Sequence, residues 1–335
     1  MYDVVVVGGG AAGLSGALAL GRSCRSVLVL DAGEPRNAPA GHMHNYLGRE
    51  STSPRELLAD GRREVEEYGV EVATARVATI RAWDRPGIGF VVTPEEGREV
   101  LARRLLVATG VADELPAVPG LKERWGRDVL HCAYCHGWEV RDQAIAVIAT
   151  NALAVHHAML FRQLSDDVVV VLAEGTEPPA AEDLERLAVR GVEVLDDAPV
   201  EVLVGDESGD ETGDGVLRGV RLASGAVLER DALVVSPVVH ARADFLAGLG
   251  LHAVPFEMGA HVLGTCLPAE PTGATAVPGV WAAGNLVDPM AQVIASAAGG
   301  LRAGATINAD LAQEDAQTAL DTHRAEFEAL LEQPG

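Results

Sequence analysis

A glycine-rich turn near the start of the chain constrains the fold more than any other feature. It follows a run of four valines suited to a buried strand, and the next ten residues have helical composition. Gly8, Gly10 and Gly13 form the pattern G-x-G-x-x-G, and Asp31 follows at the end of the next strand-like run. The first glycine of such a pattern permits a tight turn, the second lets the backbone approach a pyrophosphate, and the third lets helix and strand pack closely. The turn therefore predicts a dinucleotide on a helix N-terminus with Asp31 on a ribose, and by itself it does not separate FAD from NAD.

Strand and helix signals alternate along the chain, which predicts an α/β fold. A strand over 26–30 completes a first βαβ unit, and the pattern recurs about 140 residues later, with a strand over 144–149, a helix over 152–164 and a strand over 168–172. Two related domains are therefore expected. The other expected elements are strands near 77–83, 89–93, 105–108, 233–236 and 279–284, a helix capped by Ser53 with Pro54 in its first turn, a long helix from Pro289 onward, a charged helix over 313–331 and a polar hairpin tip over 205–215.

Charge and hydropathy exclude several classes of partner. The 335 residues include 49 acidic and 26 basic side chains, a net charge of −23, which argues against binding to nucleic acid or to an anionic membrane surface. No apolar run approaches the roughly 18 residues that a membrane-spanning helix needs, and the N-terminus has no signal-peptide pattern. We expect a cytoplasmic protein.

Two of the four cysteines form a C-x-x-C pair, Cys132 and Cys135, followed by His136. Thiols at this spacing can close and reopen a disulfide bond, which transfers two electrons. The alternative is half of a zinc site with His131 and His136 as further ligands, but the chain has no second pair at zinc-ligand spacing, so we expect no metal. Cys24 and Cys266 are interpreted as packing residues.

These elements, in this order, resemble the low-molecular-weight thioredoxin reductase family over essentially the whole chain. The matching pieces are Gly8–Gly13, Ala108-Thr109-Gly110, Cys132–Cys135 and the segment Gly279–Val293. The resemblance implies two Rossmann-like three-layer domains: a discontinuous FAD-binding domain over 1–112 and 246–335, and an inserted NAD(P)H-type domain over 113–245 that carries the C-x-x-C. It also implies a homodimer.

The resemblance implies FAD as cofactor and assigns its contacts. Asn285 replaces the usual aspartate that faces the ribityl chain, and Gln292 and Val293 are expected near the isoalloxazine; His44, Asn45 and Val77 are further contact positions. The full set is Gly8, Gly10, Ala11, Ala12, Gly13, Asp31, Pro35, Arg36, Asn37, His44, Asn45, Val77, Ala108, Thr109, Gly110, Gly284, Asn285, Gln292 and Val293.

Two departures from the family pattern point to a different electron acceptor. The inserted domain of the reductases has G-x-G-x-x-A for NADPH, whereas Ala149 and Asn151 stand at the glycine positions here, and Glu174 lies where a basic cluster would hold the 2′-phosphate. We interpret the inserted domain as degenerate. His136 replaces an aspartate, and the string Cys135-His136-Gly137-Trp138-Glu139 looks like the FAD-dependent dithiol oxidases of gliotoxin, holomycin and romidepsin type.

The sequence therefore predicts an FAD-dependent oxidase that closes a disulfide in a small-molecule dithiol and reduces O2 to H2O2, within antibiotic biosynthesis or self-resistance. Cys132, Cys135 and His136 are the predicted catalytic residues, with His136 as general acid and base because its ordinary pKa lies near neutrality. The alternatives are a thioredoxin-type disulfide reductase that uses NADPH or ferredoxin, and a non-catalytic flavin-binding protein that sequesters thiols.

Overall fold

The computed structural model describes residues 1–83, 89–205, 215–259 and 261–331. Within them, the largest sheet contains seven strands, mostly valine-rich and buried on both faces. β1, β2, β3, β6 and β19 run parallel, and β4 and β5 form an antiparallel hairpin at the edge of β6. The strand order is β3 (Glu71–Thr74), β2 (Val27–Asp31), β1 (Tyr2–Val7), β6 (Val100–Val107), β5 (Phe90–Pro94), β4 (Val77–Ala82), with β19 (Val280–Ala282) also pairing with β6.

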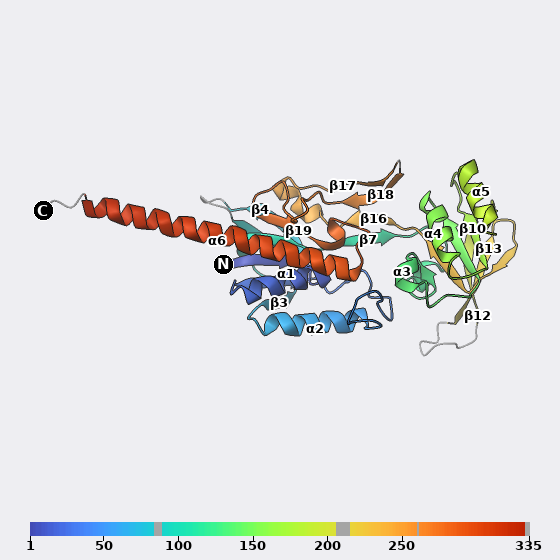
Figure 1. Cartoon of the computed structure of the whole chain (residues 1–335), viewed down its shortest axis with the longest axis horizontal. Coiled ribbons are helices and arrows are strands. Elements are labelled where there is room, and N and C mark those ends of the chain that lie inside the picture. The colour runs from blue at the N-terminus through green and yellow to red at the C-terminus, as the bar shows by residue number, and fades with distance from the viewer. Residues whose placement is uncertain (84–88, 206–214, 260, 332–335) are drawn as a thin grey trace.

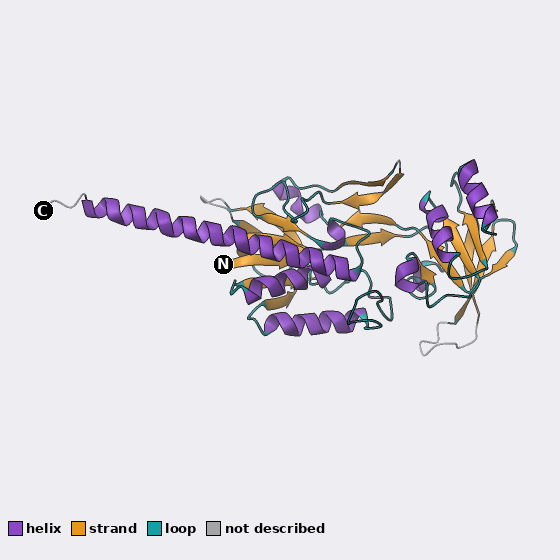
Figure 2. Cartoon of the chain, in the orientation of Figure 1, coloured by secondary structure: helices purple, strands orange, loops and turns teal. Residues whose placement is uncertain are grey.

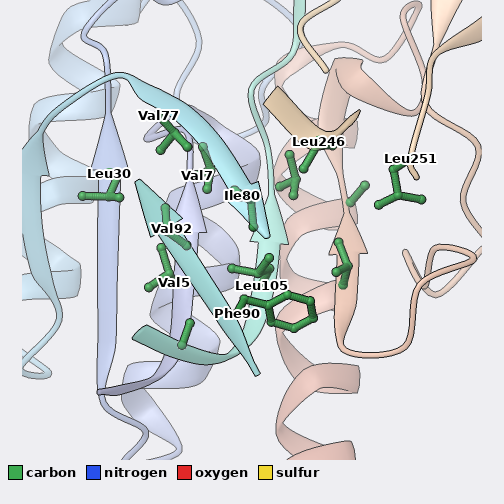
Figure 3. Close-up of a cluster of buried hydrophobic side chains, with 14 of the residues drawn as sticks. Val5, Val7, Leu30, Val77, Ile80, Phe90, Val92, Leu105, Leu246 and Leu251 are labelled. Atoms are coloured by element: carbon green, nitrogen blue, oxygen red, sulfur yellow. The ribbon is translucent and has the colours of Figure 1, made fainter. Parts of the chain in front are cut away.

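One face of this sheet carries the hydrophobic cluster drawn in Figure 3. In it, Val5, Val7, Leu30 and Phe90 from the sheet pack together with Leu246. The other face is covered by helices α1 (Ala11–Arg22), α2 (Pro54–Glu66) and α6 (Val293–Leu331). α1 and α6 cross backbone to backbone, because a Cβ atom added to Gly300 would lie 1.8 Å from the backbone oxygen of Ala12. The two ends of the chain therefore build one unit.

The middle of the chain builds a second unit, seen on the right of Figure 1. Its parallel sheet has the order β11 (Glu193–Leu195), β10 (Val168–Leu172), β9 (Ile145–Ala149), β15 (Ala232–Val235), β8 (Val129–Leu130). Helices α4 (Leu153–Phe161) and α5 (Ala181–Val189) supply one face of its core, and the antiparallel strands β12 (Pro199–Gly205), β13 (Val216–Leu222) and β14 (Val227–Glu229) cover the other.

A four-stranded sheet connects the two units, as Figure 2 shows. β7 (Val111–Glu114), which leads into the second unit, pairs antiparallel with β16 (Val238–Ala241), which leads back. β17 (Val254–Met258) and β18 (His261–Cys266) extend this sheet, and short 3₁₀ helices span Lys122–Arg124, Asp244–Leu249 and Gly284–Leu286. The domain limits at 112/113 and 245/246 fall near these connecting strands and stay a prediction.

The α/β fold with two Rossmann-type units is confirmed. Ser53 caps α2, as predicted, by accepting a hydrogen bond from the backbone of Glu56 at 3.2 Å. The last helix begins at Val293 rather than Pro289, because residues 288–291 form a turn, and it continues as one helix through the segment predicted as a separate charged helix. The predicted hairpin joins β12 to β13, with residues 206–214 outside the described part of the chain.

The two isolated cysteines, both predicted to be packing residues, differ in their burial. Cys24 does not pack in the core: it is exposed in the turn after α1 with a φ of 60°, because the chain reverses there to enter β2. Cys266 is half-buried in β18.

In the described residues, no helix combines the length and the apolar character needed to cross a membrane.

Candidate active site

A cavity of about 800 Å³ lies between the carboxyl ends of the first sheet and the segment that carries the two cysteines. Its wall is formed by residues that follow β1, β2 and β6, by the loop before α6 and by residues 131–136. Ligands of open α/β sheets bind at this edge, because the strand-to-helix turns present backbone amides there. The cavity is thus the natural site for both cofactor and reacting groups.

The glycine turn has the geometry that the tight turn and the close helix–strand packing require. A Cβ atom on Gly8, whose φ is 104°, would lie 2.5 Å from the backbone oxygen of Ala108, and one on Gly13 would lie 1.8 Å from the backbone oxygen of Gly8. A Cβ atom on Gly10 would meet no protein atom within 4 Å, although Gly10 lines the cavity. The first and third glycines are therefore required by the protein's own packing, and the second keeps space open for a ligand.

Asp31 lies at the end of β2 and lines the same cavity. One of its carboxylate oxygens accepts a hydrogen bond from the backbone of Gly9 at 3.0 Å, and the other receives one from Arg62 at 2.5 Å. These contacts fix the carboxylate beside the glycine turn, where the sequence predicted a ribose hydroxyl.

All the predicted cofactor residues line the cavity except Gly13, which packs beneath the turn, and Asn45. Asn45 instead donates its side-chain amide to the backbone oxygen of Tyr134, on the cysteine segment. Arg36 forms a bidentate ion pair with Asp113, at 2.6 and 2.8 Å, and Asn285 donates to three backbone oxygens of the turn before α6. These contacts order the cavity wall.

The cavity fits a flavin dinucleotide by the chemistry of its two ends. The glycine turn opens α1 at one side, and Gln292 and Val293 open α6 at the other, so that the amides of two helix N-termini face the cavity region. A helix N-terminus stabilises a pyrophosphate, and it equally stabilises the negative charge that a flavin ring gains on reduction.

Cys132 and Cys135 are joined by a disulfide bond, with their Cα atoms 5.2 Å apart. Cys132 precedes the single-turn helix α3 (Ala133–His136), and its backbone oxygen accepts hydrogen bonds from Cys135 and His136. The Sγ atom of Cys132 accepts a hydrogen bond from the backbone of Cys135 at 3.2 Å. A donor at this position favours a thiolate on Cys132 once the disulfide is reduced.

His136 borders the cavity with its Nε2 atom buried and without a hydrogen-bond partner among the described residues. Burial lowers its pKa below the ordinary 6.5, the carboxylate of Glu139 raises it, and the ring of His44 lowers it. The imidazole is therefore neutral at pH 7 and able to accept a proton from a thiol.

Two more histidines line the cavity and are held neutral. Burial, with the charge of Arg36 next in importance, lowers the pKa of His131 to about 3, and its ring stacks on Trp125. Burial also lowers the pKa of His157 to about 4, and its Nδ1 atom is 3.0 Å from the hydroxyl of Ser236. His157 is thus a packed histidine, while His156 is exposed.

The turn after β9, where a second nucleotide would bind, is occupied by its own side chains. The side-chain oxygen of Asn151 accepts a hydrogen bond from the backbone of Leu153 at 3.0 Å, at the start of α4. Ala149 is buried at the end of β9, and Glu174 follows β10 with an exposed side chain. A backbone amide at the start of α4 is therefore already engaged, and the strand paired with β9 is followed by an acidic residue.

Within the described residues, no group of three or more His, Cys, Asp or Glu side chains is arranged to hold a metal ion. The two sulfurs of the C-x-x-C are bonded to each other, so they are not available as thiolate ligands. The zinc alternative therefore gains no support.

The model of one protein family, pyridine nucleotide-disulphide oxidoreductase, matches residues 2–304. The chain belongs to this family. It is 31% identical to the thioredoxin reductase sirT of Leptosphaeria maculans, over 92% of this chain and 94% of the relative, and 31% identical to the thioredoxin reductase aclD of Aspergillus oryzae, over 85% and 88%. The predicted resemblance to thioredoxin reductases is confirmed, and the protein is a flavoprotein oxidoreductase of that type.

Solved structures agree with this assignment. The crystal structure of HlmI superposes with a TM-score of 0.87, at 40% identity, and the alignment covers 97% of each chain. An oxidoreductase from Agrobacterium tumefaciens superposes with a TM-score of 0.82, at 33% identity, over 92% of this chain and 98% of that one.

Sequence reasoning missed several residues of the cavity wall. Asp113, Trp125 and Arg242 belong to segments without a motif, and His131 was considered only as a zinc ligand. One signal for His131 was present in its position directly before Cys132. Asp113 and Arg242 come together only when β7 and β16 pair, which no local pattern indicates.

Proposed function

We propose that the protein is an FAD-dependent dithiol oxidase, which closes a disulfide bond in a small-molecule dithiol and reduces O2 to H2O2. The observation that carries the proposal is the contrast between its two dinucleotide turns. The turn after β1 leaves space open at Gly10, whereas in the turn after β9 the side chain of Asn151 accepts a hydrogen bond from the backbone of Leu153. This contrast favours electrons arriving from thiols rather than from a nicotinamide.

The chain's own residues account for the thiol steps. A substrate thiolate attacks Cys132, and the disulfide opens to a mixed disulfide with Cys135 as the leaving thiolate. The second substrate thiol loses its proton to His136 and displaces Cys132, which forms the product disulfide and leaves the protein pair reduced by two electrons. FAD in the adjoining cavity would accept these two electrons and pass them to O2, which with two protons yields H2O2.

Two features of the site support this pathway. Burial lowers the pKa of His136, so the ring is neutral at pH 7, and the backbone amide of Cys135 can donate a hydrogen bond to a thiolate on Cys132. The names of the relatives favour a second candidate, an NADPH-dependent thioredoxin-type reductase. The homodimer and the cytoplasmic location stay predictions.

One experiment separates the two functions. The purified yellow protein is mixed anaerobically with a panel of small dithiols or with NADPH, and the flavin absorbance is followed. Rapid bleaching by a dithiol, with O2 consumption and peroxide formation on admission of air, supports the oxidase. Rapid bleaching by NADPH and none by any dithiol would establish the reductase instead.

A further inference from the structure

A second, smaller cavity of about 200 Å³ lies behind His136. It is lined by His44 and Glu139 as well as by His136, and both histidines also border the large cavity. Its volume exceeds that of several water molecules, at about 30 Å³ each. His136, whose buried Nε2 atom lacks a partner among the described residues, thus borders a second space that the thiol chemistry does not use.

His44 joins this space to the surface. Its Nε2 atom lies 3.4 Å from a carboxylate oxygen of Glu139, and its Nδ1 atom lies 2.6 Å from one of Glu50. The His44 side chain is only 16% exposed, whereas the side chains of Glu139 and Glu50 are 43% and 60% exposed. The second oxygen of Glu50 accepts a hydrogen bond from the backbone of Asn45 at 2.9 Å, so the carboxylate is held in place.

The proposed function leaves His136 with a proton to dispose of. Each dithiol gives up protons as its sulfurs join, and His136 can accept another only after it has lost the first. We propose that Glu139, His44 and Glu50 form the proton exit of His136. The proton leaves the imidazole of His136 for the carboxylate of Glu139 across the small cavity. It reaches solvent from Glu139 directly or, by way of His44, from Glu50. The inference rests on the proposed function and adds a path to it.

The charges around His136 agree with this direction of transfer. Glu139, three residues further along the chain, attracts a proton onto the ring, and His44, from the loop before α2, opposes it. His131 is neutral, and Arg127 also lines the small cavity. Because burial lowers the pKa of His136, its ring releases an accepted proton readily.

The test compares steady-state dithiol oxidation by the FAD-loaded enzyme and its variants Glu139→Gln, His44→Gln and Glu50→Gln, in a dilute bulky buffer with and without added imidazole. Glu177→Gln, an exposed carboxylate on the second unit, is the matched control. Loss of the exit is expected to slow turnover by about tenfold or more, and imidazole, a small diffusible proton carrier, should restore most of it. The control should keep the wild-type rate.

The pH dependence gives an independent readout. Removing the Glu139 carboxylate should move the acid limb of the rate profile to lower pH by up to about one unit, and removing His44 should move it to higher pH. The proposed proton exit would be wrong if Glu139→Gln and His44→Gln kept the wild-type rate and the wild-type acid limb of the pH profile. It would also be wrong if imidazole did not restore a lowered rate, and in both cases the proposed oxidase function would stand. If the wild type oxidises no dithiol, the proposed function fails, and the exit fails with it.

Discussion

The side-chain amide of Asn45 donates a hydrogen bond, 2.5 Å long, to the backbone oxygen of Tyr134, which lies between the two reactive cysteines. Asn45 belongs to the loop before α2 in the first unit, and Tyr134 belongs to α3 in the second. Asn45 holds a φ of 61°, a conformation that asparagine tolerates better than most residues. The contact ties the disulfide to the unit that forms the cofactor cavity.

Replacing Asn45 with alanine should therefore slow the transfer of electrons from the dithiol to the flavin. The lost hydrogen bond is expected to cost about 1 kcal/mol, and the positive φ adds strain for alanine. Stopped-flow bleaching of the flavin by a dithiol measures the effect, with flavin content as a check on the cofactor site. Asn308→Ala, which removes an acceptor of Arg25 far from the cavity, should leave the bleaching rate unchanged. Equal rates in both variants would contradict the role given to Asn45.

Gly10→Ala and Gly13→Ala form a matched pair for the cofactor site. The added methyl group of Gly10→Ala meets no protein atom, so this chain should fold normally and lose affinity for FAD. The methyl group of Gly13→Ala would overlap the backbone oxygen of Gly8, so this chain should be destabilised by several kcal/mol, in the range of severe overpacking. Urea unfolding of the apoproteins and titration with FAD separate the two effects. Full FAD affinity in Gly10→Ala would place the pyrophosphate elsewhere.

His136 should give the thiol reaction its pH dependence. Because burial lowers the pKa of His136 below 6.5, the base is fully available at neutral pH, and the rate should fall only as the pH drops through that lowered value. His136→Ala should reduce the rate by a factor of about 10² to 10⁴ and abolish this limb, with FAD still bound. The rate of anaerobic flavin bleaching by a dithiol, measured between pH 5 and 8 for both proteins, tests this prediction. An unchanged turnover rate in His136→Ala would show that His136 is not the general base.

Arg104 should contribute to stability rather than to catalysis. Its side chain is buried in the first unit, and it reaches Asp310 at 2.5 Å and Glu314 at 2.8 Å on α6. Arg104→Ala should cost about 2 kcal/mol, less than a fully buried ion pair because both carboxylates reach solvent. Chemical unfolding measures the loss, and Arg324→Ala on the exposed end of α6 should change stability by no more than about 0.5 kcal/mol.

Local patterns were sufficient to predict the first βαβ unit and the glycine turn within it. The valine run of β1, the glycines and the run ending at Asp31 each carry a periodicity or a steric requirement within a few residues. The cap at Ser53 belongs to the same class of signal, and it is present in the structure.

The parts that sequence reasoning missed depend on contacts between distant segments. β7 and β16 are short and only partly buried, and no pattern within either strand predicts that the two pair with each other. Asn45 was assigned to the cofactor from the family resemblance, whereas the fold turns its amide toward Tyr134. The proximity of His44 and Glu139 likewise exists only after the two units have come together.

The strand β19 pairs with β6 although the entire second unit separates them in the chain. On the ribosome, the early strands must therefore wait with an open edge while the middle unit, whose five parallel strands lie between residues 129 and 235, emerges and folds. Gly284, Asn285 and Gln292, which complete the cavity wall, are translated later still. Capture of the flavin is thus a late, post-translational event, and a nascent chain stalled before its last fifty residues should be colourless.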